Sequence, residues 1–413
     1  MTWHWSRAAV MLTMFMPALT CAEETAWQKS WDATFYVYPQ FTDINHESLL
    51  NPGNQVARLP ETSISAEARA NVELKSETLR VFLRPIVLLR KFDGDSLTED
   101  QHEGYLSQWQ ARLSLSPDLN FSVGRDLLNW GPGQFRSPSS PFYFNNGRSN
   151  PMRELSGVDD LKLSWSPNAS SSLFLARITG SGHQPEGGDP WDDSWLGKGE
   201  LRGDAWTLGL ALADIPGQKT FIGLYGQWTM DDAWLLYGEA GSGSIGPIRA
   251  VDAAAQWQLL AESPRRASVL AGATYTLING QSLTAEYLWY GHGYDSAESD
   301  AYFERAQAAA ALPPAAMLRT LGTTLQASPP LLNHDYLHLI WQNSLMAATT
   351  YWRLMYSHNL NDDSGELAVY GEHYITGRLS CFVLAVANNG GNRQEFGQFI
   401  DGNVLLGLRL AIP

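Results

Sequence analysis

The fold of this chain is decided by residues 63–90, SISAEARANVELKSETLRVFLRPIVLLR. In 63–74 every second side chain is apolar, and the side chains between them are serine, glutamate, arginine and asparagine. After a short turn the alternation resumes, and Arg80 and Arg84 lie on its polar face. Alternation with a period of two places the two kinds of side chain on opposite faces of a β-strand. The stretch therefore predicts two antiparallel strands, each with one apolar and one polar face.

The same pattern recurs along the chain in segments of about ten residues, the length of a tilted membrane-spanning strand, whereas soluble strands average about five or six. A soluble β-sandwich also alternates, but it does not combine such long strands with strongly unequal connections. Tight turns are expected at 116–118, 166–168, 278–280 and 376–378, and long loops at 41–61, 91–103, 129–156, 180–198 and 293–333. We therefore predict an all-β fold, a single antiparallel transmembrane β-barrel of 16–18 strands, with 18 preferred.

The preferred count of 18 includes strands at 200–213 and 249–260, and the region 232–277 is the least regular part of the pattern. An even number of strands returns both termini to the same side of the membrane. It also places all four tight turns on that side, which we expect to be the periplasmic side.

Residues 1–22 have the features of a secretory signal peptide. Arg7 supplies the positive charge, an apolar stretch follows, and Thr20-Cys21-Ala22 ends in a small residue suited to cleavage. The rest of the chain contains no apolar run long enough for a membrane-spanning helix. We therefore expect residues 23–413 to form the barrel and to reside in the cell outer membrane, with membrane lipid and the barrel-assembly machinery as partners.

The composition excludes several other classes of protein. The formal net charge of −15 argues against a nucleic-acid partner. Only Cys381 remains after the signal peptide, so neither an internal disulfide nor a cysteine-rich metal site can form. No nucleophile, zinc, phosphate-binding or dinucleotide motif occurs. We predict that the protein is not an enzyme and needs no metal or cofactor.

The long loop 129–156 is rich in glycine, proline, asparagine, arginine and aromatic residues. A loop of this length is usually functional or disordered, and its aromatic side chains argue for burial. We predict that it folds into the lumen and narrows it. The residues expected to form the constriction are Trp130, Gly131, Pro132, Gly133, Phe142, Asn145 and Asn146.

The polar faces of the strands and the long loop carry many charged side chains, and an arginine that faced the lipid core would cost about 2–4 kcal/mol. The residues expected to line the pore or contact a solute are Arg69, Arg80, Arg84, Arg112, Arg136, Arg148, Arg153, Glu286, Arg353, Glu372 and Arg409. In one interpretation a basic wall faces an acidic one and filters solutes by charge. In the other, these side chains pair with one another and fill the barrel. Arg125 follows the apolar phase of its strand, which predicts a bulge or a place at the rim.

An alanine-rich segment, 297–321, interrupts the alternation and is prone to form helix, with Pro313 and Pro314 breaking it. We expect it to belong to the extracellular loop 293–333.

Residues 124–142, GRDLLNWGPGQFRSPSSPF, resemble the GR…WGPG stretch of porin-like outer-membrane barrels of Gram-negative bacteria. Together with the following FNNGR at 144–148, they are also similar to the WGPG…NNxR pattern of capsule-assembly barrels. The resemblance implies a large outer-membrane barrel, and the second family is 18-stranded and binds surface polysaccharide.

The function expected from these features is passive passage of small polar solutes, anionic or sugar-like, through an outer-membrane channel. The alternative is a plugged barrel that binds a surface polysaccharide or serves envelope assembly without conducting.

Overall fold

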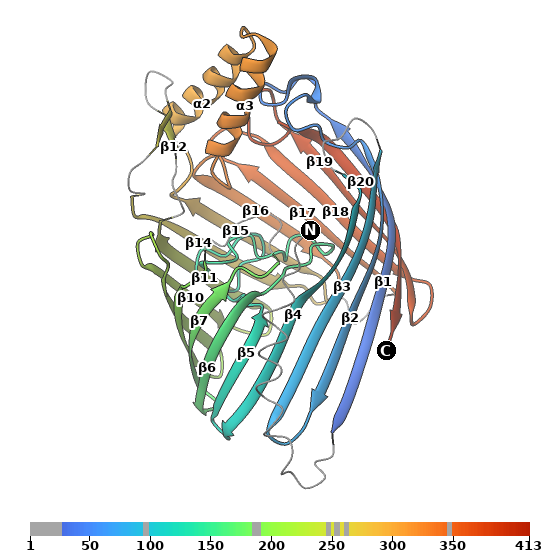
Figure 1. The fold of residues 1–413 in the computed structure, drawn as a ribbon, viewed down its shortest axis with the longest axis vertical. Helices are drawn as coiled ribbons and strands as arrows, with labels where there is room; N and C mark the ends of the chain where they lie inside the picture. Colours follow the sequence, from blue (N-terminus) through green and yellow to red (C-terminus); the bar gives the residue numbers. More distant parts are fainter. Residues whose placement is uncertain are drawn as a thin grey trace.

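The computed structural model describes residues 27–93, 99–183, 191–244, 249–251, 257–259, 264–344 and 349–413. Within them eighteen antiparallel strands form one sheet that closes on itself, because β1 pairs with both β2 and β20. The barrel strands are β1 (Gln28–Ile44), β2 (Thr62–Lys75), β3 (Leu79–Asp93), β4 (Gln101–Ser116), β5 (Leu119–Asp126), β6 (Val158–Asn168), β7 (Ser171–Gly180), β8 (Trp195–Arg202), β9 (Trp206–Asp214), β10 (Phe221–Thr229), β11 (Trp234–Gly243), β14 (Arg266–Thr276), β15 (Ser282–Tyr290), β16 (Asp335–Gln342), β17 (Thr350–Asn359), β18 (Gly365–Tyr374), β19 (Leu379–Asn389) and β20 (Ile400–Ile412). The predicted all-β, 18-stranded barrel is confirmed (Figure 1). The predicted signal peptide, 1–22, lies outside the described residues.

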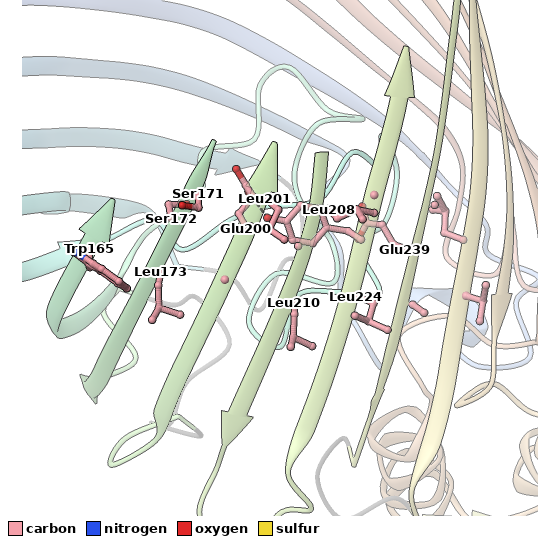
Figure 2. Close-up of a pocket in the computed structure, with 18 of the residues that line it drawn as sticks. Trp165, Ser171, Ser172, Leu173, Glu200, Leu201, Leu208, Leu210, Leu224 and Glu239 are labelled. Carbon is pink, nitrogen blue, oxygen red and sulfur yellow. Dashed lines mark hydrogen bonds between the residues drawn. The ribbon is translucent and has the colours of Figure 1, made fainter. Parts of the chain in front are cut away.

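The outside of the barrel is apolar because the apolar phase of each strand points outward. On β20 the outward-facing Leu406 and Leu408 are exposed, whereas Arg409 faces the lumen and pairs with Glu372 of β18. Figure 2 shows the outer wall across β7 to β10, where a shallow depression is lined by leucines such as Leu173 and Leu210. Such a surface matches the hydrocarbon of a bilayer rather than water.

Tryptophans gather on the outer surface toward one end of the barrel. Trp206 lies opposite Trp228 in the β9–β10 pair, and Trp234 lies opposite Tyr275 in the β11–β14 pair. All three tryptophans are exposed. Amphipathic rings of this kind favour the boundary between hydrocarbon and water, so they place one membrane interface at this end.

Two of the eighteen expected strands were wrong, but the total number of strands is unchanged because one segment holds two strands and the other holds none of the barrel. Residues 200–213 span two strands, β8 and β9, which are separated by a tight turn in which Gly203 N donates to Trp206 O at 2.8 Å. Residues 249–260 add no barrel strand, because β12 (Arg249–Val251) and β13 (Trp257–Leu259) pair with each other while β11 pairs directly with β14. Alternation is a local signal and does not specify which strand a segment pairs with.

The start of β1, the end of β20 and the tight turns share one end of the barrel. The turns that close β4–β5, β6–β7, β14–β15 and β18–β19 all lie at the end where β1 begins and β20 finishes. The long connections lie at the other end, which is called the loop end below. Among the described residues, no helix is long and apolar enough to cross a membrane.

The segment expected to be helix-prone holds two helices, α2 (Ser296–Ala309) and α3 (Pro314–Ala327), at the loop end (Figure 1). Asp295 and Glu298 form a reciprocal cap at the start of α2, and Pro314 begins α3. Buried side chains of both helices pack on the β1–β2 loop, which contains a short 3₁₀ turn, Pro52–Asn54. The helices therefore cover one side of the loop end.

Candidate functional site

The β5–β6 connection, residues 127–157, folds into the barrel, and Figure 1 shows it inside the ring of strands. Its aromatic side chains Trp130, Phe142 and Tyr143 are buried against the inner wall of β6 to β10. Burial of each large apolar side chain stabilises by about 1.5–3 kcal/mol, which explains why so long a loop is ordered. The predicted inward-folded loop is confirmed.

Glu239 of β11 holds the first half of the loop. Its carboxylate accepts hydrogen bonds from Gly133 N at 2.7 Å, Ser137 Oγ at 2.6 Å, and Ser139 N and Oγ at 3.2 and 2.7 Å. Gly131 lies against the same carboxylate with φ of +85°, and a Cβ there would stand 2.4 Å from Glu239 Oε1. Glycine is therefore required at this position for the loop backbone to reach the carboxylate.

Glu286 of β15 makes the second attachment. It accepts from Gln134 N at 2.6 Å, Phe135 N at 3.3 Å and Tyr237 Oη at 2.7 Å. The ring of Phe135 stacks on His338 of β16, with 4.4 Å between ring centres. Glu286, expected to contact a solute, thus binds backbone N–H groups of the loop.

Two arginines of the opposite wall make the third attachment. Arg69 Nη1 and Arg84 Nε contact Glu154 at 3.1 and 2.8 Å, and Arg69 Nη2 donates to Met152 O at 3.0 Å. Arg69 also pairs with Glu67 at 2.7 Å. The loop is therefore fastened across the lumen, to β11 and β15 on one side and to β2 and β3 on the other.

The return half of the loop is braced by arginine and asparagine. Arg148 Nη1 donates to the carbonyl oxygens of Gly131 and Gly133 at 2.6 and 2.9 Å, and Asn146 Nδ2 donates to Gly133 O at 2.7 Å. Arg353 of β17 in turn donates to Arg148 O at 2.7 Å. Both of these arginines, expected to line the pore, satisfy loop carbonyl groups.

The remaining residues predicted for the constriction belong to the same folded loop. Pro132 O accepts from Gln134 Nε2 at 3.0 Å, and Asn145 Oδ1 accepts from Gly147 N at 3.3 Å. Trp130 Nε1 donates to Ser139 O at 3.0 Å. These contacts are internal to the loop and fix its shape.

Two wall glycines allow the loop to lie directly on the sheet. A Cβ at Gly241 of β11 would stand 1.8 Å from Pro138 O, and one at Gly223 of β10 would stand 2.2 Å from Ser139 O. No side chain fits at either position unless the loop moves. Backbone of the loop thus packs on backbone of the wall.

Several arginines of the lumen have no carboxylate partner. Arg112 of β4 lies directly opposite Arg80 of β3, and Arg80 pairs with Glu73 at 2.9 Å. Among the described residues Arg112 forms no ion pair, and neither does Arg153, which is exposed in the loop. Arg80 already has Glu73 as its partner, so Arg112 is the one of the two whose charge favours a further anion nearby.

Arg136 of the loop faces the loop end of the lumen. Its guanidinium donates to Phe135 O at 2.9 Å. Burial lowers the pKa of Arg136, and attraction by Glu366 and Glu395 opposes that shift. Burial also raises the pKa of Glu395 to about 7, although Tyr336 and Leu332 N donate to its carboxylate. Arg136 is therefore a poorly solvated guanidinium that lies near Glu366 and Glu395 and forms an ion pair with neither of them.

Arg125 is the exception to the inward set. It points outward near the loop end, and its Nε and Nη2 pair with Asp159 at 2.8 and 3.0 Å. This agrees with the rim position rather than with a bulge, because the β5–β6 register is regular at this pair.

Sequence reasoning missed Glu239, the residue with the most contacts to the loop. It lies in the region 232–277, where the strand assignment was least certain. The signal was present, because Glu239 is the single acid in the inward phase of β11, between Tyr237 and Gly241. Within the described residues, no group of three or more histidine, cysteine, aspartate or glutamate side chains is placed to hold a metal ion.

Comparisons with known proteins place the fold. No family model matches the chain, and no curated protein matches it in sequence. Solved structures that share its fold include OccAB1 of Acinetobacter baumannii (13% identity over 93% of this chain and 96% of that chain, TM-score 0.59). OprD of Pseudomonas aeruginosa is 11% identical over 93% of this chain and 95% of that chain, with a TM-score of 0.55. OpdK of the same species, solved with vanillate, is 11% identical over 93% of this chain and 98% of that chain, also with a TM-score of 0.55. The chain therefore has the fold of porin-like outer-membrane barrels.

Proposed function

We propose that this protein is a channel of the bacterial outer membrane that passes small polar solutes through a lumen narrowed by its own loop. The observation that supports it is the fastening of residues 127–157 across a lumen whose wall carries charged side chains. A loop held by Glu239 and Glu286 on one side and by Arg69 and Arg84 on the other restricts the size of a solute and presents charge to it.

The charge of the lumen favours anions in this proposal. Arg90, Arg112 and Arg153 carry no carboxylate partner among the described residues. Arg90 donates to Ser65 Oγ and Tyr38 Oη at 2.9 and 3.4 Å and lies over the ring of Phe92. Guanidinium groups match carboxylate, phosphate and sulfate. OpdK was solved with vanillate, an aromatic carboxylate, so small carboxylates are the first solutes to test here.

Single-channel recording in planar bilayers tests the proposal. Purified protein that migrates as a heat-modifiable barrel should give steady, ohmic current steps. Silence from such protein would favour the plugged barrel, in which the fastened loop closes the lumen and the loop end binds a polysaccharide.

The orientation of the barrel gives a prediction of its own. An epitope inserted after Ala311, in the exposed turn between α2 and α3, is expected to be labelled on intact cells, because the long loops should face outward. The same epitope after Asn279, in the tight β14–β15 turn, should be labelled only after the outer membrane is permeabilised. Labelling in the opposite order would reverse the orientation.

Arg112 tests the anion preference. Arg112→Gln removes a cation that no carboxylate neutralises, and the range of its field is about 10 Å at 0.1 M salt. The reversal potential across a salt gradient should therefore shift toward cation preference, most strongly at low ionic strength. Arg319→Gln on α3 makes the same change in formal charge on an exposed helix and should leave the reversal potential unchanged. Equal shifts in both variants would show that Arg112 does not line the conducting path.

A further inference from the structure

The two ends of the lumen loop meet at a group of charged side chains, of which Asp160 and Lys162 are buried and Asp126 is partly exposed. Asp126 is the last residue of β5, and Asp160 and Lys162 follow the start of β6 at Val158. The β5–β6 register places Asp126 opposite Val158 and Gly124 opposite Asp160. This group, Asp126, Asp160 and Lys162, is called the root cluster below. Any change in its charge acts where the loop leaves the wall.

Within the root cluster the single cation is engaged mainly by Asp126. The Lys162 ammonium pairs with the Asp126 carboxylate and lies 3.9 Å from Asp160 Oδ2. Gln110 Nε2 of β4 also donates to Asp126, at 3.0 Å. The beginning of the loop is therefore tied to β4 and β6 through Asp126.

Asp160 is buried without a hydrogen bond. Its side chain has no solvent exposure, and neither carboxylate oxygen accepts a hydrogen bond from any described residue. An ionised carboxylate in such a place costs several kcal/mol. Two carboxylates that share one cation also raise the proton affinity of one of them. Both effects favour a proton on Asp160.

Among the residues that the structure describes, the surrounding elements supply no second cation to the interior of the cluster. From the loop, Tyr143 faces Asp126 and Asp160, and its hydroxyl donates to Ser156 O at 2.8 Å. From β7 the buried neighbours are Ala176 and Ile178, of which Ile178 lies opposite Asp160. The Arg125–Asp159 pair carries both signs and points outward on the same two strands.

We propose that the root cluster holds one exchangeable proton, carried by Asp160, and that its release loosens the root of the lumen loop. When the proton passes to bulk water, the buried Asp160 carboxylate competes with Asp126 for one ammonium, and the cluster gains a net negative charge. Lys162 then moves toward Asp160 and weakens its contact with Asp126. Because Asp126 is the last residue before the loop, the loop root opens as the pH rises.

The experiment reads the loop directly rather than through conduction. Ser156 is buried at the end of the loop, and its Oγ donates to Ser107 O at 3.2 Å. A cysteine is placed there by Ser156→Cys in a Cys381→Ser background, and the rate of maleimide labelling is measured between about pH 5 and about pH 9. The same protein with Asp160→Asn is measured in parallel. Thiol ionisation occurs in both proteins, and an ionised Asp160 near the thiol would raise the thiol pKa and slow labelling, which is opposite to the increase expected here.

The labelling rate of the protein with Asp160, divided by the rate of the Asp160→Asn variant, is expected to be near one at the acid end and to rise several-fold at the alkaline end. Lys162→Met should label fast across the whole pH range, because no ammonium remains to hold Asp126 or to move toward Asp160. Asp32→Asn, a change to an exposed aspartate on β1, should leave the ratio as it was. A flat ratio in folded protein, or labelling of Lys162→Met as slow as that of the parent at the acid end, would overturn the proposal.

The outcome is independent of whether the barrel conducts. If the barrel is silent and its labelling ratio rises with pH, the proposal for the root cluster is supported and the channel function is rejected. If the barrel conducts and its labelling ratio is flat, the channel function is supported and the proposal for the root cluster is rejected. If Asp160→Asn does not fold, the labelling rate of the parent relative to Lys162→Met decides, because this ratio should be well below one at the acid end and approach one at the alkaline end.

Discussion

Replacing Glu239 and Glu286 together with alanine is expected to release the lumen loop and raise single-channel conductance several-fold. The two carboxylates accept backbone and hydroxyl hydrogen bonds from residues 133–139 of the loop. Hydrogen bonds to charged groups contribute about 1.5–3 kcal/mol each, so their loss outweighs what any one remaining contact of the loop provides. Released on this side, the loop should leave the centre of the lumen and make the current noisier. A barrel that is silent before the change should begin to conduct.

The matched control is Glu73→Ala with Glu372→Ala. These glutamates also face the lumen and change the charge equally, but their contacts are Arg80 for one and Arg409, Ser380 and Tyr370 for the other. Neither contacts the loop. Conductance should change far less in this pair. If both double variants fold and conduct alike, the loop does not limit the current.

A second large effect is expected when Gly241 is replaced with valine, which displaces the loop without removing any charge. The Cβ alone would stand 1.8 Å from Pro138 O, which is an overlap. The sheet holds the backbone at Gly241, and the prolines stiffen the loop backbone, so neither can shift easily. Overpacking of this kind costs about 1–3 kcal/mol, and the loop can relieve it by leaving the wall. Conductance should therefore rise with the charge selectivity of the pore unchanged. The readouts are conductance and reversal potential on the same protein.

Gly197→Val provides the control for this wall substitution. Gly197 lies on β8, and a Cβ there would meet no atom within 4 Å. The variant loses the same backbone freedom and adds the same side chain, but it should conduct like the parent. A Gly241→Val barrel that folds and conducts like the parent would show that loop and wall are not in contact in the membrane.

The two experiments separate the anchoring of the loop from its charge. The glutamate variants change both the position of the loop and the charge of the lumen, whereas the glycine variant changes only the position of the loop. If conductance rises in both but selectivity shifts only with the glutamates, then Glu239 and Glu286 contribute to the field that a solute meets. If neither variant conducts, the plugged barrel becomes the better description, with the helices and loops of the loop end as the surface to test for polysaccharide binding.

The sequence by itself determined the fold class, since the period-two pattern is a property of neighbouring residues. Residues 63–90 form β2 and β3 with the two faces that their alternation predicts, and Arg69, Arg80 and Arg84 lie on the lumen side. The inward-folded loop was also predictable, because aromatic side chains such as Trp130 and Phe142 must be buried and a barrel offers only its interior. Strand boundaries were not, as the division of 200–213 into β8 and β9 shows.

Only the tertiary structure decided what the charged residues do. Arg84 was expected to face a solute, but it holds Glu154, 70 residues along the chain, and Glu286 holds Gln134, 152 residues away. Such partners depend on which strands the closed sheet brings around the loop, and alternation within one strand carries no information about that. The same holds for Asp160, whose isolation follows from the apolar wall of β7 beside it. Side-chain direction is local and can be read from the sequence, whereas partnership across a lumen is set by the closure of the barrel.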